Sequence, residues 1–168
     1  MLPIISGVGL KAFVEVKLNQ TTSCVRYVHL GVETGNLTVN TWQCPAGYDW
    51  TAASANPATD CGQQADNKFI SLQPGGTGKP NVYSGHSGDT GPGTITFTTM
   101  IPGPYLVFAR SEPFGSNTDW HVLGACGSDP IAVVDWDFSP GSGWIPNAVI
   151  TSGGTTVCNV YLVPPAPA

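Results

Sequence analysis

The sequence predicts an all-β protein that folds as an antiparallel β-sandwich, with an additional strand segment near its N-terminus. Strand-like stretches rich in Val, Ile, Thr and aromatic residues recur along the 168 residues, and clusters of Gly, Pro, Asn and Ser separate them. The sequence contains no apolar stripe at helical spacing that is long enough to indicate a helix. Short strands at this density are typical of a sandwich.

Ten stretches fit strands when the chain is followed from its start. In order, they are residues 11–18, 24–30, 36–43, 68–72, 94–99, 105–110, 120–124, 131–138, 148–151 and 155–163. In the fifth stretch, Ile95, Phe97 and Thr99 alternate with other threonines, so one face can be buried and the other left in water. Pro102 and Gly103 then predict a turn, because proline presets one backbone dihedral and glycine accepts a positive one.

Three segments outside these strands are expected to be loops or exposed ends. Residues 51–64 contain Pro57, which disfavours a helix there. Residues 84–93 contain four Gly and one Pro. Residues 165–168 form a Pro/Ala tail, which cannot pair inside a sheet because proline lacks the amide donor.

The alternation within the strands also predicts the core. Residues of one parity in a strand share a face, and the apolar face is expected to be buried. The predicted core residues are Val39, Phe69, Ile95, Phe97, Tyr105, Val107, Val122, Val134, Trp136, Val160 and Leu162.

A short pattern near the start of the chain returns near its end. Residues 21–27 and 155–161 share the frame Thr-Thr-x-Cys-x-x-Tyr. One domain needs only one such strand. We therefore interpret residues 1–35 as an N-terminal strand extension and residues 36–164 as the sandwich domain, followed by the tail at 165–168.

The extension carries apolar side chains that need a partner. These assembly-strand residues are Phe13, Val14, Val16, Val25 and Tyr27. Left in water, they would form an apolar edge of the kind that soluble proteins cover or charge. The extension could pair with the same chain's sandwich or, by strand addition, with a neighbouring subunit. The second arrangement would make the protein a homopolymer.

Charge and hydropathy argue against two classes of partner. The six basic residues are scattered along a chain of net charge -5, whereas a nucleic-acid surface needs clustered cations to displace counterions from phosphates. No apolar run reaches the roughly 18 residues needed to span a bilayer. The sequence therefore predicts neither a nucleic-acid partner nor a membrane span.

The five cysteines indicate an oxidising compartment. A chain so poor in charge, with 10% charged residues, fits a small β-domain that is cross-linked by disulfides outside the cell or at its surface. No Cys-x-x-Cys pair is present, and the spacings match no zinc site. An odd number of cysteines leaves one thiol free or bonded to another chain.

Candidate catalytic and metal-binding groups all have plainer explanations. Asp135 and Asp137 share one face of a predicted strand and form a weak calcium candidate, but solvent-facing aspartates on either side of an inward Trp136 explain them better. The single triplet that begins at Asp89 fits a turn. The three histidines fit no catalytic triad or metal frame. We therefore expect no enzyme activity, no metal and no cofactor.

Two of the five tryptophans are candidates for carbohydrate contact. Trp50 and Trp144 lie in loop-like surroundings, where an aromatic plane could stack on a sugar ring. Packing within the fold is the favoured explanation for both. A glycan therefore stays a possible partner.

From residue 36 onward, the order of motifs resembles the prealbumin-like β-sandwich domains of bacterial surface proteins, the SpaA-like or Cna B-type group. The motifs are a Cys-Pro-x-Gly-Tyr opening at residues 44–48, the turn and strand at 88–97, the Pro-Gly-x-Tyr strand at 102–107, Cys126 and the final strand from Cys158. The resemblance is to cysteine-bearing variants and covers about three quarters of the chain. It implies a prealbumin-like or Ig-like sandwich.

Within this framework we predict two disulfides. Cys44 is expected to pair with Cys61 and close a loop with little regular structure, and Cys126 is expected to pair with Cys158. Four cysteines allow three pairings, so the connectivity is a hypothesis. Cys24 is left as the free or intermolecular thiol.

These observations favour a structural function. The hypothesis is a subunit of an extracellular filament, pilus or surface layer, assembled by β-strand pairing and stabilised by disulfides. The alternative is an adhesin or carbohydrate-binding module that uses Trp50 and Trp144.

Overall fold

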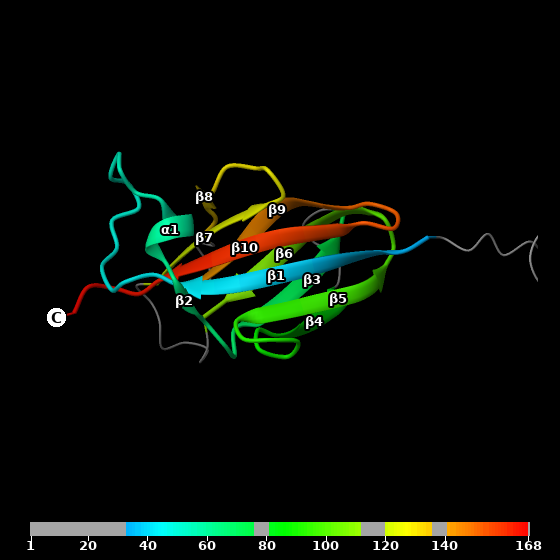
Figure 1. Cartoon of the computed structure of the whole chain (residues 1–168), viewed down its shortest axis with the longest axis horizontal. Helices are drawn as coiled ribbons and strands as arrows, with labels where there is room; N and C mark the ends of the chain where they lie inside the picture. The colour runs from blue at the N-terminus through cyan, green and yellow to red at the C-terminus, as the bar shows by residue number, and fades with distance from the viewer. Residues whose placement is uncertain (1–32, 76–80, 112–119, 136–140, 168) are drawn as a thin grey trace, which may run out of the picture. The chain divides into compact units, whose positions relative to one another are not determined.

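The computed structural model describes residues 33–75, 81–111, 120–135 and 141–167. Within these residues the protein is all-β, with two sheets and a single helical turn (Figure 1). The elements are β1 (Gly35–Gln43), α1 (Pro57–Asp60), β2 (Gln63–Gln64), β3 (Phe69–Pro74), β4 (Tyr83–His86), β5 (Thr94–Met100), β6 (Gly103–Arg110), β7 (His121–Cys126), β8 (Ala132–Val133), β9 (Ser142–Ile150) and β10 (Thr155–Val163). The all-β prediction is confirmed for this part of the chain.

The first sheet has the order β2-β1-β10-β7-β8, and β5 also pairs with β1. Its pairs are antiparallel except that of β1 with β10, which run parallel from Asn36 opposite Thr155 to Gln43 opposite Leu162. Strand β10 therefore lies in the interior of the sheet, between β1 and β7. The second copy of the repeated frame, residues 155–161, occupies this central position.

The second sheet has the order β4-β3-β6-β9, and all its pairs are antiparallel. Strand β9 is longer than the predicted stretch 148–151, because it continues through a bulge at Pro146 and Asn147, opposite Leu106. Asn147 has a φ of 62°. A bulge leaves a residue without a ladder partner, so proline is tolerated there. The sequence did not reveal this strand, because proline is normally excluded from the interior of a strand.

The core lies between the two sheets and contains most of the predicted residues. Val134 is only partly buried but packs against the core, and Trp136 lies outside the described residues. The predicted residues that the structure buries are Val39, Ile95, Phe97, Tyr105, Val107, Val122, Val160 and Leu162.

The predicted orientation of β3 was wrong. Phe69 is only partly buried, whereas Ile70 and Leu72 are fully buried in the core. Strand residues of opposite parity face opposite sides of a sheet. Both faces of this strand begin with an apolar residue, so alternation alone could not identify the inward one.

A bulge in β5 also changes which residues face inward. Leu37 of β1 lies opposite Phe97, but Gly35 lies opposite Met100, so an extra residue is inserted near Thr99. Thr99 has a φ of 55°, which is uncommon for a β-branched residue. Met100 is therefore fully buried and takes the inward place that the alternation predicted for Thr99, which is exposed.

Two predicted loops contain short regular elements. Residues 51–64 include the helical turn α1, which begins at Pro57, where a proline amide is not needed. Residues 84–93 include most of β4. A Cβ at Gly85 would lie 2.4 Å from the Cδ1 atom of Ile95, so glycine allows β4 to approach β5.

One side of the sandwich is closed by backbone hydrogen bonds between the two sheets. Val134, just after β8, donates to Val122 O of β7 over 2.9 Å and accepts from Trp144 N of β9 over 3.0 Å. A Cβ at Gly143 would lie 2.3 Å from Val134 O, so this approach requires glycine. On the opposite side, β4 and β5 are edge strands of different sheets, and both lie along the lower edge in Figure 1.

The predicted N-terminal extension, residues 1–35, lies outside the described residues except at residues 33–35, of which Gly35 already belongs to β1. This applies to the predicted strands 11–18 and 24–30, to Cys24 and to the assembly-strand residues. No helix in the described part of the chain is long and apolar enough to cross a membrane.

Replacing Phe97 by Ala should lower the free energy of unfolding by about 3–5 kcal/mol, because it would leave a cavity in the core. Thr98→Ala, at the exposed neighbouring position, should change it by less than about 0.5 kcal/mol. Urea denaturation of both variants gives the comparison. Equal stability of the two variants would show that Phe97 does not support the core.

Candidate functional site

The structure contains both predicted disulfides, Cys44 with Cys61 and Cys126 with Cys158. Cys126 and Cys158 lie directly opposite each other on β7 and β10, and both are buried. The first disulfide joins the residue that follows β1 to the residue that follows α1. The two cross-links therefore hold the strand order of the first sheet and the loop at its end.

Hydrogen bonds hold the loop between Cys44 and Cys61 in one conformation. Tyr48 Oη donates to Asp60 Oδ2 over 2.8 Å, and the Asn56 amide donates to the same oxygen over 2.8 Å. Burial and the Asp60 carboxylate raise the pKa of Tyr48 to about 12. The Asn56 amide and the Tyr48 hydroxyl lower the pKa of Asp60. The loop is thus a preformed surface.

Trp50 extends from this loop and packs on the first sheet. Its ring lies 4.3 Å from the ring of His121, centroid to centroid. His121 Nδ1 lies 2.6 Å from Asp135 Oδ2, and the Val122 amide donates to Asp135 Oδ1 over 2.5 Å. Trp50 also packs against the cluster around Tyr161. These contacts support packing as the role of Trp50.

The contacts of Asp135 with His121 and Val122 also concern the calcium candidate, which was Asp135 together with Asp137. Both carboxylate oxygens of Asp135 are occupied by protein partners, and Asp137 lies outside the described residues. Among the residues that the structure describes, no group of three or more His, Cys, Asp or Glu could hold a metal ion. Its contact with the Val122 amide gives Asp135 a structural role, because it holds the segment that closes the sandwich.

Trp144 lies in strand β9, not in a loop as the sequence suggested. Its ring packs at 4.8 Å against Phe108 of the neighbouring strand. Trp144 also lines a hollow of about 560 Å³ that includes Asp129, Asp135 and Asn147. Trp50 does not line this hollow. The two candidate tryptophans therefore do not form one site, although Asp135 contributes to the surroundings of both.

The outer face of the second sheet carries an aromatic row that the sequence analysis missed. Phe69 of β3 lies 6.3 Å from Phe108 of β6, which contacts Trp144 of β9. The Arg110 guanidinium lies 5.1 Å from the centre of the Phe69 ring. These residues sit at the parity opposite to the core, which is the signal that could have identified them. Their proximity depends on strand pairing between distant segments.

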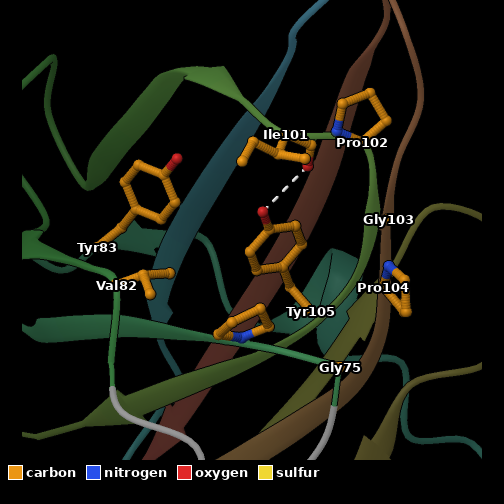
Figure 2. Close-up of a pocket in the computed structure, with 9 residues that line it drawn as sticks. Gly75, Val82, Tyr83, Ile101, Pro102, Gly103, Pro104 and Tyr105 are labelled. Atoms are coloured by element: carbon orange, nitrogen blue, oxygen red, sulfur yellow. Dashed lines mark hydrogen bonds between the residues drawn. The ribbon is translucent and has the colours of Figure 1, made fainter. Parts of the chain in front are cut away.

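A second hollow lies at the open side of the sandwich, near the ends of β3, β4 and β5. It has a volume of about 500 Å³ and is mainly apolar. In Figure 2, Val82 and Tyr83 lie on one side, residues 101–104 lie on the other, and the Tyr105 ring lies between them. Tyr105 Oη donates to Ile101 O over 3.0 Å, as the dashed line shows. We call this hollow the edge groove. Its lining residues are Pro74, Gly75, Val82, Tyr83, Ile101, Pro102, Gly103, Pro104 and Tyr105.

The edge groove exposes large apolar side chains. Val82 is 49% exposed and Ile101 is 64% exposed. Exposed apolar residues that gather at a hollow mark interaction sites more often than isolated ones do. The sequence signal was the Ile-Pro-Gly-Pro-Tyr run at residues 101–105, which the sequence analysis explained as a turn alone.

The Asp89-Thr90-Gly91 triplet lies in the turn between β4 and β5, as the sequence predicts. The Asp89 carboxylate accepts a hydrogen bond from the His86 amide over 2.7 Å. Nearby, Asp66 accepts one from the Gly93 amide over 2.6 Å. Both carboxylates brace the end of the β4 and β5 edge that is opposite to the edge groove.

Comparisons with known proteins do not assign this chain to a family. A scan against models of protein families gives no match, and searches of curated proteins and of solved structures give none either. The proposals that follow therefore rest on the sequence and on the geometry of the described residues.

Replacing either disulfide pair by alanines should lower the free energy of unfolding by roughly 3–4 kcal/mol, because each disulfide restricts the unfolded chain. The longer loop, with a sequence separation of 32 against 17, should show the larger loss. Urea denaturation of the two double variants measures both effects. Peptide mapping without reduction that joined Cys44 to Cys126 would contradict the pairing.

Proposed function

We propose that this protein is a structural subunit of an extracellular filament, pilus or surface layer, assembled by β-strand pairing between copies. The observation that carries the proposal is the position of β10. Its Thr-Thr-x-Cys-x-x-Tyr frame, residues 155–161, already lies between β1 and β7. The matching frame at residues 21–27 therefore has no vacant central position in this sheet.

The completeness of the described sandwich supports the same proposal. Core residues from both sheets, including Val39, Leu72 and Val160, are fully buried and pack together in one cluster of described residues. We infer that the N-terminal extension is not needed to complete this core. A surplus apolar strand is stabilised most by adding to an exposed sheet edge, where main-chain hydrogen bonds supply binding affinity.

The disulfides support a location outside the cell or at its surface. Disulfides persist in oxidising compartments, and two are formed here. The finer fold that we propose is the prealbumin-like sandwich. The support for it is the motif order, in which the Cys-Pro-x-Gly-Tyr opening follows β1 and the Pro-Gly-x-Tyr segment begins β6.

Strand addition between copies also accounts for a polymer. The donor strand and the acceptor edge are different surfaces of one subunit, so the contact is heterologous. Such a contact propagates into a filament unless its rotation closes a ring. Cys24 lies within the extension and could make the contact covalent.

Deleting residues 1–30 should yield a folded monomer with both disulfides that no longer assembles, because the deletion removes the connecting strand and leaves the core intact. Analytical ultracentrifugation and electron micrographs of the full and shortened proteins measure assembly, and peptide mapping checks the disulfides. A shortened protein that still polymerised, or that could not fold, would contradict the role of the extension as a connector.

A specific observation favours a second candidate, an adhesin or carbohydrate-binding module. The hollow beside β9 combines an aromatic surface, Trp144, with the polar side chains of Asp129, Asp135 and Asn147. Apolar planes that contact the sugar face, together with a few polar groups that fix its orientation, are typical of small-molecule sites. In this case the monomer would bind a glycan without assembling.

For this second candidate, Trp144→Ala should reduce glycan affinity at least about tenfold, because stacking area is lost. The matched control is Trp50→Ala, which removes a tryptophan that does not line the hollow. Binding is measured by calorimetry with sugars selected on a glycan array. Equal affinity for the two variants, or no selective sugar on the array, would count against this site.

A further inference from the structure

We propose that the open edge of β5, together with the edge groove at its end, is the acceptor site for the N-terminal strand segment of a second copy of this chain. This inference rests on the proposed function, since it names the surface on which the connecting strand binds. It commits to one occupant, the apolar stretch at residues 11–18.

From Thr96 onward, the backbone of β5 has one side without a partner among the described strands; at its start, the Thr94 amide and carbonyl are already bonded to Gly91 and Gly88 of the preceding turn. Thr41 N donates to Gly93 O over 2.7 Å, in continuation of the register that places Val39 opposite Ile95. Hydrogen-bonded pairs alternate along an antiparallel ladder. The amide and carbonyl groups of Ile95 and Phe97 therefore face β1, whereas those of Thr96 face away. Among the described strands, β5 pairs with β1 alone.

The seam between β4 and β5 is tight at one end, where Gly85 and Ile95 approach closely. At the other end, the Tyr83 ring lies 6.1 Å from Phe97 and 6.4 Å from Tyr105. Tyr83 also lines the edge groove, so the groove is continuous with the aromatic part of the core. An apolar side chain bound there would extend that core.

The two parts of the chain have opposite charge. Residues 1–32 contain three basic residues and one acidic residue, whereas residues 33–168 contain three basic and ten acidic residues. The carboxylates of Asp66 and Asp89 lie at the tight end of the seam. Residues 11–18 themselves carry two lysines and one glutamate. Laid along β5, this segment would run between an acidic end and an apolar end, and its net positive charge favours this pairing over that of two acidic sandwich surfaces.

The pattern of residues 11–18 matches such an edge. Val14, Val16 and Leu18 share one parity, whereas Lys11, Phe13, Glu15 and Lys17 share the other. In an added strand, one face would carry the two valines and the leucine toward the seam and groove, and the other would carry the three charged side chains and Phe13 away from it. Main-chain bonds to the edge would give affinity, and the edge groove would give specificity for an apolar side chain.

Residues 19–32 join this segment to the described chain and give it its reach. Extended chain spans roughly 3.3 Å per residue, so these 14 residues can cover about 46 Å. The nine residues of β1 span about 30 Å by the same rule. The segment is thus long enough to leave its own sandwich and lie along β5 of a neighbour.

The first test uses two pairs of variants of the full chain. Thr96→Pro removes the outward amide of β5, and Thr96→Val is its control, since both variants lose the hydroxyl contact with Thr38 but valine keeps the amide. Ile101→Lys places a positive charge in the edge groove, the same sign as the net charge of the donated segment. Val149→Lys changes a residue of β9 that is 51% exposed and serves as its control.

Thr96→Pro and Ile101→Lys should each raise the critical concentration for assembly at least about tenfold, with the controls within about twofold of the unmodified protein. Ile101→Lys decides the outcome if the proline variant does not fold. Assembly of Ile101→Lys at the concentration of its control would overturn the assignment of the acceptor site.

The second test is a photo-cross-link from position 101. Full-length chains that carry benzoylphenylalanine at this position are mixed with isotopically heavy chains, and the cross-linked peptides are sequenced by mass spectrometry. Cross-links from position 101 of one isotope to residues 11–18 of the other are expected. Cross-links confined to a single isotope, or directed to another region, would overturn the proposal.

The two proposals can fail separately. If the protein without residues 1–30 still assembles, the connecting strand itself is wrong. If that deletion abolishes assembly but Ile101→Lys assembles like Val149→Lys, only the acceptor site is wrong.

Discussion

The structure depends on the insertion of β10 between β1 and β7. Parallel pairing with β1 and antiparallel pairing with β7 place this strand inside the first sheet, and the Cys126–Cys158 disulfide fixes it there. Both faces of the strand are consequently buried. Val160 and Leu162 face the core between the sheets, whereas Tyr161 and Val163 face the cluster that contains the Cys44–Cys61 disulfide. The near-continuous apolar run of this strand follows from that double burial.

The two sides of the sandwich differ in how the edges of the two sheets are joined. At one side, Val134 bonds to both sheets, and Gly143 permits the approach of the two backbones. Asp135 holds the same segment by accepting from the Val122 amide. At the other side, β4 and β5 are edge strands, and the backbone bond between them, from Gly88 N to Thr94 O, lies at the turn that joins them. Unpaired edges are templates for association, so in the proposed assembly this asymmetry would direct strand addition to that side.

Sequence reasoning succeeded where the signal was local. The cysteine pairing, a hypothesis among three possible pairings, also agrees with the structure. The local signal was the alternation in β5, which identified Ile95 and Phe97 as core residues. Such signals survive because the period of side chains along a strand is two, whatever the strand pairs with.

It failed where position depends on distant segments. The inward face of β3 required knowledge that Ile70, not Phe69, packs on the other sheet, and the bulge at Thr99 is set by pairing with β1. The edge groove is lined by the end of β3, the start of β4 and residues 101–105, which lead from β5 into β6, so the run at 101–105 could not by itself be distinguished from a turn. Trp144 was assigned to a loop because Pro146, two residues later, argued against a strand at this point.

In the proposed assembly, the position of the acceptor edge has a mechanical consequence. The connecting segment leaves the sandwich at the start of β1, and the strand that receives the next subunit's segment, β5, pairs directly with β1. Tension along a filament would therefore cross each subunit through one pair of neighbouring antiparallel strands. If the donated strand leaves β5 at its Thr94 end, away from Gly35 at the start of β1, this tension loads their hydrogen bonds in shear, all at once, and does not peel them apart in sequence. The parallel ladder from β1 to β10 lies immediately behind this pair, and the Cys126–Cys158 disulfide ties β10 to β7. The cross-link thus sits in the strands that brace the loaded pair, where it resists separation of the sheet without stiffening the edge that must accept a partner.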